Sequence, residues 1–256
     1  MPAPTPSLQR LADGPARWHT IEHHEQVGST NDLALASLRA GTPPGHVISA
    51  DRQTAGRGRR GRSWQDRPAG ASLATSVTLP SLADHNALVP LVAGVAVVDA
   101  LRRAGVLAGL KWPNDAVVEL SDGGRAKLAG ILAEAVPEGI VVGVGLNVDL
   151  RGQEPVEGAT SAAEVLGADV DRWELLQEYL GALESWLGDL VTDGPLRLVA
   201  AYRGLCTTLG RDVIATVGDG EVVGRAVEVA PDGALVVRTG AGARVAVSSG
   251  EVVHLR

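Results

Sequence analysis

The chain has 256 residues and carries 23 basic against 30 acidic side chains, which gives a formal charge of −7. That acidity argues against general nucleic-acid binding, which needs a clustered basic surface, and a 45% hydrophobic content excludes a disordered chain. No apolar run reaches the ~18 residues of a membrane span. Cys206 is the only cysteine, so no internal disulfide can form. We expect a cytoplasmic globular protein of one or two domains, with no membrane partner.

The first 205 residues are expected to hold a tail and one mixed domain. Residues 1–16 are rich in proline and predict a loose tail, followed by a domain over residues 17–205. The predicted strands there are His19–Val27, Val47–Ala50, Ser72–Leu79, Leu107–Lys111, Ala116–Leu120, Leu128–Val136 and Ile140–Val148. The predicted helices are Asp32–Arg39, Leu88–Arg103, Arg172–Leu190 and Leu196–Leu205. Short connections between the last three strands, at residues 121–124 and 137–139, favour an antiparallel meander.

The character of the chain changes after Gly210. Short apolar segments alternate there with Gly-Asp-Gly, Pro-Asp-Gly and Gly-Ala-Gly turns, a pattern typical of a small β-barrel. The predicted strands are Val213–Val217, Glu221–Val229, Ala234–Thr239, Arg244–Val247 and Val252–Leu255. We expect a separate C-terminal domain over residues 206–256.

A long loop from Gln53 to Gly70 concentrates positive charge, with six Arg against two Asp between Asp51 and Arg67. Its segment Gly56–Gly61 matches the letters of a dinucleotide-binding fingerprint, but no helix follows it, which excludes that interpretation. Glycines let backbone N–H groups approach an anion, and guanidinium groups bind phosphate or carboxylate oxygens in pairs. The loop is interpreted as an anion-binding segment; a solvated loop or a weak RNA contact are the alternatives.

The chain's two lysines each begin a further motif. In Lys111–Asp115 a proline restricts the residue before it, which makes a stiff corner able to present a cation and a carboxylate. Lys127 opens the apolar strand Lys127–Leu132, where Gly130 permits close approach of a ligand or another backbone. A surface turn and a lysine that guards a sheet edge are the alternatives for these two motifs.

Taken in order, five motifs together resemble those of the biotin protein ligases. They are Ser29–Asn31, Gln53–Trp64, Lys111–Asp115, Lys127–Leu132 and Gly143–Asn147. The resemblance implies an α+β catalytic domain of the class II aminoacyl-tRNA-synthetase-like type, with a mainly antiparallel sheet, and a C-terminal SH3-like barrel. Members that also act as repressors carry an N-terminal winged helix-turn-helix, for which the first 16 residues leave no room. We therefore expect no repressor function and no nucleic-acid partner.

The family uses ATP with Mg²⁺ to join biotin to a protein in two steps. Biotin and ATP give biotinyl-5′-AMP and pyrophosphate, and a lysine of the biotin carboxyl carrier domain of an acyl-CoA carboxylase then displaces AMP. The six histidines have no metal-ligand spacing, so we expect magnesium to enter with ATP rather than at a metal site of the chain. A lipoate-protein ligase is an alternative that would lack the arginine loop and the Lys111–Asp115 corner, and an RNA-binding module using that loop is another.

The resemblance also implies roles for individual residues. The candidate catalytic residues are Lys127, Lys111, Asp115 and Arg57, with Asp115 expected to orient or deprotonate the incoming lysine. The residues expected to bind biotin are Ser29, Thr30, Asn31, Gln53, Arg57, Gly58, Arg59, Lys127, Gly130, Gly143 and Gly145. The residues expected to bind ATP or the adenylate are Arg57, Arg59, Arg60, Arg62, Trp64, Lys111, Asn114, Lys127 and Asn147. Trp64 is expected to stack on adenine. The two glycines of Gly143–Asn147, which lie on one face of an apolar strand, are expected to leave a slot beside the neighbouring strand.

Overall fold

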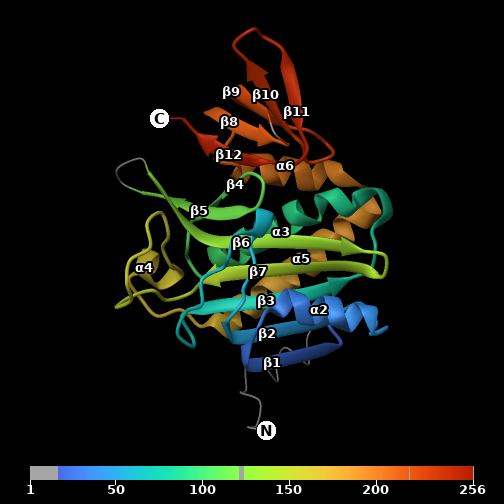
Figure 1. Ribbon diagram of the computed structural model, residues 1–256, viewed down its shortest axis with the longest axis vertical. Helices are drawn as coiled ribbons and strands as arrows, with labels where there is room; N and C mark the ends of the chain where they lie inside the picture. Colours follow the sequence, from blue (N-terminus) through green and yellow to red (C-terminus); the bar gives the residue numbers. More distant parts are fainter. Residues whose placement is uncertain (1–16, 121–123, 219, 256) are drawn as a thin grey trace.

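The computed structural model describes residues 17–120, 124–218 and 220–255, which form two β-sheets and the helices packed on them (Figure 1). The strands of the larger sheet are β1 (Thr20–Val27), β2 (His46–Gln53), β3 (Ser72–Leu79), β4 (Gly109–Lys111), β5 (Asp115–Glu119), β6 (Arg125–Val136) and β7 (Gly139–Asn147). Their order across the sheet is β1-β2-β3-β7-β6-β5-β4. The predicted tail at residues 1–16 and most of the predicted turn after β5 lie outside the described residues.

The larger sheet is mainly antiparallel, as predicted. Strands β5, β6 and β7 form the expected meander, while β1 and β2 pair in parallel. Strand β3 pairs along its whole length with β7, which places β7 in the middle of the sheet. Because β7 has a partner on each side, its backbone is held in a fixed position. The two strands that carry the glycine motifs therefore lie side by side at the centre of the sheet.

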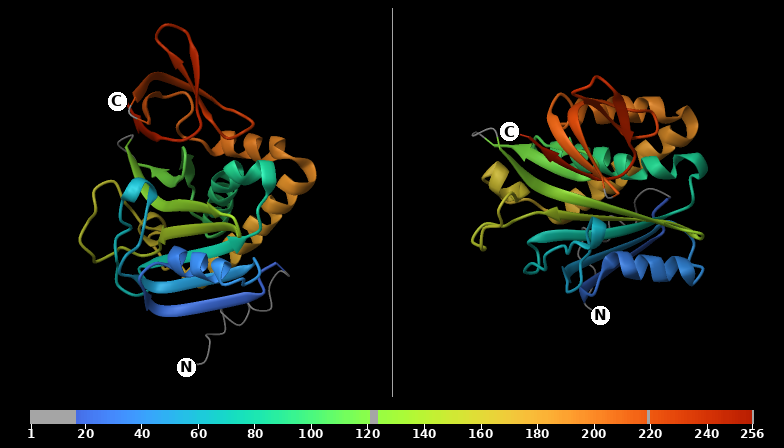
Figure 2. Two further views of the ribbon diagram at one scale, coloured as in Figure 1. Left: turned by 45° about the vertical axis from the view of Figure 1, so that its right-hand side comes forward. Right: turned by 45° about the horizontal axis from the view of Figure 1, so that its top comes forward.

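Helices cover the two faces of this sheet unequally (Figures 1 and 2). Helix α2 (Thr30–Arg39) packs over β2, β3 and β7 on one face, while α3 (Val89–Arg103) and α5 (Arg172–Asp193) pack together on the other. The remaining helical segments are η1 (Arg59–Gly61), η2 (Ala83–Leu88), α4 (Ala162–Leu166) and α6 (Pro195–Leu205). On the face that carries α2, the part of the sheet that this helix does not cover faces the loop that follows β2.

One helical stretch in the described part of the chain, Ala83–Arg103, is long and apolar enough to cross a membrane by composition alone. Its α3 portion lies instead in the core, where Val92, Val95 and Leu101 are almost completely buried. The apolar character of this helix therefore follows from its position between α5 and the sheet.

The smaller sheet is entirely antiparallel and follows α6 in the chain, as predicted. Its strands are β8 (Asp212–Val217), β9 (Gly220–Val229), β10 (Leu235–Thr239), β11 (Arg244–Val247) and β12 (Glu251–His254). They lie in the order β11-β10-β9-β8-β12. Each is within two residues of the predicted strand, because the Gly-containing turns that separate them are strong local signals.

The smaller sheet is joined to the corner between β4 and β5. The indole N–H of Trp112 donates to the carbonyl of Gly233 at 3.0 Å, and its backbone N–H donates to Oγ1 of Thr208 at 3.1 Å. Trp112 is 1% exposed, so these bonds are shielded from water. Cys206 at the end of α6 is buried as well, and burial raises the pKa of its thiol, as expected for a packing cysteine.

Candidate functional site

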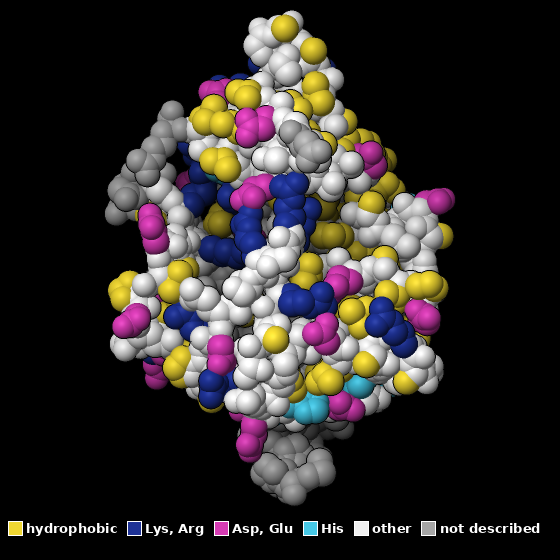
Figure 3. All heavy atoms as spheres, viewed as in Figure 1, with side chains coloured by type: hydrophobic (Ala, Val, Ile, Leu, Met, Phe, Trp, Pro, Cys, Tyr) yellow, Lys and Arg dark blue, Asp and Glu magenta, His cyan; other side chains and the backbone are white. Residues whose placement is uncertain are grey.

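A cavity open to solvent lies on the sheet face that carries α2. Figure 3 shows this hollow below the smaller sheet, with Lys and Arg side chains gathered in it. Its walls come from the start of α2, the loop after β2, the β4–β5 corner, the middles of β6 and β7 and the start of β12. Of the predicted site residues it brings together Ser29, Thr30, Asn31, Gln53, Arg57, Gly58, Arg59, Arg60, Arg62, Trp64, Lys111, Asn114, Asp115, Lys127, Gly130, Gly143 and Gly145.

The arginine loop, predicted to be irregular, forms a tight hairpin over this cavity. The backbone N–H of Gly58 donates to the carbonyl of Arg62 at 2.7 Å, and that of Trp64 donates to the carbonyl of Gly56 at 2.8 Å. The hairpin turns where Arg60 and Gly61 both have positive φ, of 57° and 74°. A positive φ costs a non-glycine residue energy and is a common feature of functional loops. The hairpin thus carries four arginines on a short, well-defined stem.

The cavity is strongly cationic although the whole chain is acidic. Among the described residues that line it, six are Arg or Lys and two, Asp115 and Glu251, are acidic. Oδ1 of Asp115 accepts from Nζ of Lys127 at 2.7 Å, and Glu251 of β12 pairs with Arg62 of the hairpin. Burial, and then the neighbouring Arg60 charge, lower the pKa of Arg59. An anion entering this cavity would therefore relieve repulsion between like charges.

Polar side chains at the start of α2 form one end of the cavity. The hydroxyl of Ser29 caps the helix, and both the N–H and the hydroxyl of Thr30 donate to Oε1 of Gln53, at 2.8 and 3.0 Å. Ser76 on β3 donates its hydroxyl proton to Oδ1 of Asn31 at 2.6 Å. Sequence reasoning missed Ser76, because nothing in the strand Ser72–Leu79 separates it from the other small polar residues there.

The glycines of β7 mark where two side chains pack directly on the strand. A Cβ at Gly143 would lie 2.0 Å from Oδ1 of Asn31, and a Cβ at Gly145 would lie 2.5 Å from the Trp64 ring. The predicted slot beside β7 therefore exists, but Asn31 and Trp64 occupy it in this structure. Lys127 lies close to Trp64 as well, with its Nζ 5.6 Å from the ring centre.

The Lys111–Asp115 corner divides its side chains between the core and the cavity. Trp112 points into the core, whereas Lys111, Asn114 and Asp115 line the cavity, and the Trp112–Pro113 peptide bond is cis. The amide of Asn114 donates to the carbonyl of Ile131 at 2.8 Å. That bond and the reciprocal backbone bond fasten the corner to β6.

Asn147 is the predicted site residue that lies outside the cavity lining. Its side-chain amide donates to the carbonyls of Thr160 and Lys127, at 3.0 and 3.4 Å, and the residue is only 6% exposed. In this structure the Asn147 amide contacts the backbone of Lys127, and its predicted contact with ATP stays a prediction. The N–H of Lys127 also donates to the carbonyl of Gly158 at 2.7 Å, so the backbone of this lysine is held at two points.

Arg57 lines the cavity, but its guanidinium already has acceptors. It donates to both carboxylate oxygens of Glu134 at 3.0 Å and to Oδ1 of Asp32 at 2.6 Å. Three of its five N–H groups are therefore engaged with carboxylates in this structure, and its predicted contact with a substrate anion stays a prediction. Sequence reasoning missed Glu134 and Glu251. Glu134 could have been identified from the sequence, because it is a carboxylate within the otherwise apolar strand Leu128–Val136. Glu251 lies in the other sheet, and no feature of the sequence points to it.

Two family matches cover most of the described chain. Residues 24–150 match the Biotin/lipoate A/B protein ligase family, and residues 208–255 match the Biotin protein ligase C terminal domain. The Biotin--[acetyl-CoA-carboxylase] ligase of Mycobacterium tuberculosis is 38% identical, with 93% of this chain and 90% of that protein covered. The Bifunctional ligase/repressor BirA of Bacillus subtilis is 27% identical, with 86% of this chain and 70% of that protein covered.

The fold is similar to that of a solved ligase. The biotin protein ligase from Aquifex aeolicus, in complex with biotin and ATP, superimposes with a TM-score of 0.78 at 28% sequence identity. The match covers 93% of this chain and 99% of the Aquifex chain. Both sheets are therefore shared with that protein.

Proposed function

The chain belongs to the biotin protein ligase family, and we propose that its cavity joins biotin to AMP and then passes biotin to a lysine of a carrier protein. The carrier is a biotin carboxyl carrier domain of an acyl-CoA carboxylase, and both substrates are encountered in the cytoplasm. The observation that carries this proposal is the cationic cavity under the arginine hairpin, at the centre of a sheet whose glycines admit close packing.

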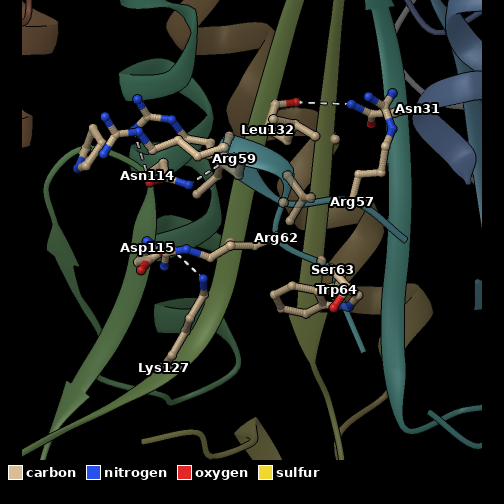
Figure 4. A pocket seen from close by; sticks show the side chains of 18 of the residues that line it. Asn31, Arg57, Arg59, Arg62, Ser63, Trp64, Asn114, Asp115, Lys127 and Leu132 are labelled. Carbon is tan, nitrogen blue, oxygen red and sulfur yellow. Dashed lines mark hydrogen bonds and ion pairs between the residues drawn. The ribbon is translucent and has the colours of Figure 1, made fainter. Parts of the chain in front are cut away.

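The first step brings two anions together, because the carboxylate of biotin attacks the α-phosphate of ATP. Positive groups fixed around the reacting oxygens offset that repulsion and stabilise the charge that develops in the transition state. We assign this work to Arg59, Arg60, Arg62, Lys111 and Lys127, which line the cavity together. Figure 4 shows Lys127 and Asp115 facing each other beside the hairpin arginines.

Each end of the cavity suits a different part of the substrates. The hydrogen-bonding groups of Ser29, Thr30, Asn31 and Gln53 suit the polar ring end of biotin, and Gly130, Gly143 and Gly145 suit its apolar body. Gly58 and the neighbouring Arg59 suit the carboxylate. Trp64, at the end of the hairpin, offers adenine a stacking surface. Asn114 lies beside Arg59, where the phosphates and the magnesium that accompanies them would be held.

The second step needs a base for the lysine of the carrier. Asp115 is a carboxylate at the open corner of the cavity, and its partner Lys127 is held by its own backbone rather than by this ion pair alone. If Lys127 turns to the oxygens of the adenylate, the carboxylate of Asp115 is free to accept a proton from the incoming amine. The displaced AMP carries away the electron pair of the broken bond to the acyl carbon.

Mass spectrometry of a biotin carboxyl carrier domain tests the function directly. After incubation with the chain, biotin and MgATP, we expect one added biotin on the carrier, and none when ATP is omitted. Lipoate in place of biotin is expected to add nothing. Addition of lipoate but not biotin would contradict the proposed substrate, and no addition of either, together with binding of a short RNA in calorimetric titration, would favour the RNA-binding alternative.

A further inference from the structure

The four arginines of the hairpin do not share one environment. Arg57 faces Asn31 at one side of the cavity, whereas Arg59 and Arg62 face Asn114 and Asp115 at the other (Figure 4). The guanidinium of Arg57 makes three hydrogen bonds to two carboxylates, at 2.6 to 3.0 Å. Arg59 makes one long bond of 3.4 Å to Asn114. The first arginine of the hairpin is thus already neutralised.

The bond to Glu134 is of the paired kind that fixes geometry. Two parallel N–H···O bonds between a guanidinium and a carboxylate set the direction as well as the distance. Glu134 lies on β6 opposite Val141 of β7, so its backbone belongs to the rigid part of the sheet. Asp32 lies in the first turn of α2 and approaches the same guanidinium from the other side. The start of the hairpin is therefore tied to the sheet and to the helix at once.

Glu134 also reaches the polar end of the cavity. Its Oε2 accepts from Nδ2 of Asn31 at 2.7 Å, while Oδ1 of that asparagine accepts from the hydroxyl of Ser76 at 2.6 Å. These two bonds set which way the Asn31 amide faces. One carboxylate thus connects the hairpin to the residue that packs on Gly143 of β7.

We propose that Arg57 is a positioning residue, held by Asp32 and Glu134, that fixes the stem of the hairpin over the cavity and couples it to the orientation of Asn31. The substrate anions are then left to the arginines at the tip of the hairpin. This inference rests on the proposed function, because it assigns a part of that site. It differs from a role of Arg57 mainly in direct contact with biotin or ATP, because three of the five guanidinium N–H groups already bind the two carboxylates.

A double-mutant cycle of Arg57→Ala and Glu134→Gln distinguishes a positioning role of Arg57 from direct contact with the substrates. If the pair acts as one clamp, each single variant raises the KM for biotin about tenfold, which is about 1.4 kcal/mol, with kcat of pyrophosphate release within threefold. The double variant is then no worse than the poorer single variant. A kcat about 100-fold lower in Arg57→Ala, with Glu134→Gln unchanged, would show direct action on the substrates and overturn the proposal.

Electrostatic attraction alone predicts that Glu134→Gln lowers the KM for biotin, which is opposite to the change expected here. Removing a negative charge beside a cationic cavity should strengthen the binding of anionic biotin and lower its KM. A raised KM therefore reports lost positioning rather than changed charge. Glu138→Gln is the matched control, because Glu138 is exposed in the turn that follows β6 and has the same charge. It is expected to leave KM and kcat unchanged.

Limited trypsin digestion gives a readout that needs no activity. In the protein without ligands, and at a temperature well below the unfolding midpoint of either variant, Glu134→Gln is expected to speed cleavage at Arg59 to Arg62 about fivefold relative to Glu138→Gln. Equal cleavage rates would overturn the clamp whether or not the chain makes biotinyl-5′-AMP. Faster cleavage in a chain that releases no pyrophosphate would keep the clamp and refute the proposed function.

Discussion

Replacing Gly143 by alanine tests whether Asn31 packs directly on the central strand. A Cβ at this position would lie 2.0 Å from Oδ1 of Asn31, 2.9 Å from its Cγ and 3.2 Å from its Nδ2. The strand cannot retreat, because Gly143 pairs with Ser76 of β3 and with Leu132 of β6. Asn31 must therefore turn away.

The cost follows from the two short hydrogen bonds that Asn31 would lose. The bond from Ser76 joins neutral groups and contributes about 1 kcal/mol, and the bond to Glu134 involves a charged acceptor and contributes about 2 kcal/mol. Alanine in a strand regains roughly 0.5–1 kcal/mol of backbone entropy. We expect a net loss of about 2 kcal/mol in the free energy of unfolding.

Thermal unfolding and calorimetric titration with biotin measure the two consequences. A loss of about 2 kcal/mol should lower the Tm by roughly 4–8 °C in a chain of this size, and biotin should bind at least tenfold more weakly. Gly181→Ala is the control, because Gly181 lies in the exposed middle of α5 with open space around it. It should raise stability and leave biotin binding unchanged. A Gly143→Ala chain with normal Tm and normal affinity would refute the packing described here.

Three further predictions follow from the site and its surroundings. Lys127→Ala should lower pyrophosphate release at least ~10²-fold, whereas Arg39→Ala, at the far end of α2, should change it little; equal rates in both would contradict the assignment. Gly145→Ala should displace Trp64 and narrow the space for the body of biotin, which raises the KM for both ATP and biotin in initial-rate assays; an unchanged KM for ATP would contradict adenine stacking. Burial, followed by nearby cations, lowers the pKa of His254 to about 4, so the folded chain keeps it neutral while the unfolded chain binds a proton below about pH 6.5. The contribution of His254 to the free energy of unfolding should be complete above pH 6.5 and fall by about 1–2 kcal/mol towards pH 4, after allowance for solvent screening. Thermal unfolding at a series of pH values measures this fall, and an equal fall in His254→Gln would contradict the prediction.

Most helices and strands could be predicted because their signals are local. The predicted helix Leu88–Arg103 begins one residue before α3, and the predicted strand Ser72–Leu79 is β3 itself. The predicted strand Leu107–Lys111 is longer than β4, which begins at Gly109. Leu107 is 81% exposed, so its apolar character reflects no pairing. Apolar pattern alone does not tell where a neighbouring strand ends.

The motifs identified the residues that face the cavity better than the residues that hold them in place. Asn31 and Gly143 belong to separate motifs, and their contact depends on α2 crossing a strand more than 100 positions away. Glu134 and Glu251 hold the hairpin from two different sheets. Such contacts follow from the order of strands in the sheet, with β7 between β3 and β6, and no short segment encodes that order.

The shape of its charged group explains why position 127 is a lysine in a chain with 21 arginines. Nζ of Lys127 lies 2.7 Å from Asp115, 3.0 Å from where a Cβ of Gly130 would be, and 5.6 Å from the centre of the Trp64 ring. A guanidinium is planar and presents its donors in a fixed fork, whereas the ammonium group of lysine is a compact point charge. A compact charge on a flexible stem can also leave Asp115 for an incoming anion at little cost. The preference for arginine over lysine in this chain therefore does not extend to position 127, where the shape of the charged group matters as well as its charge.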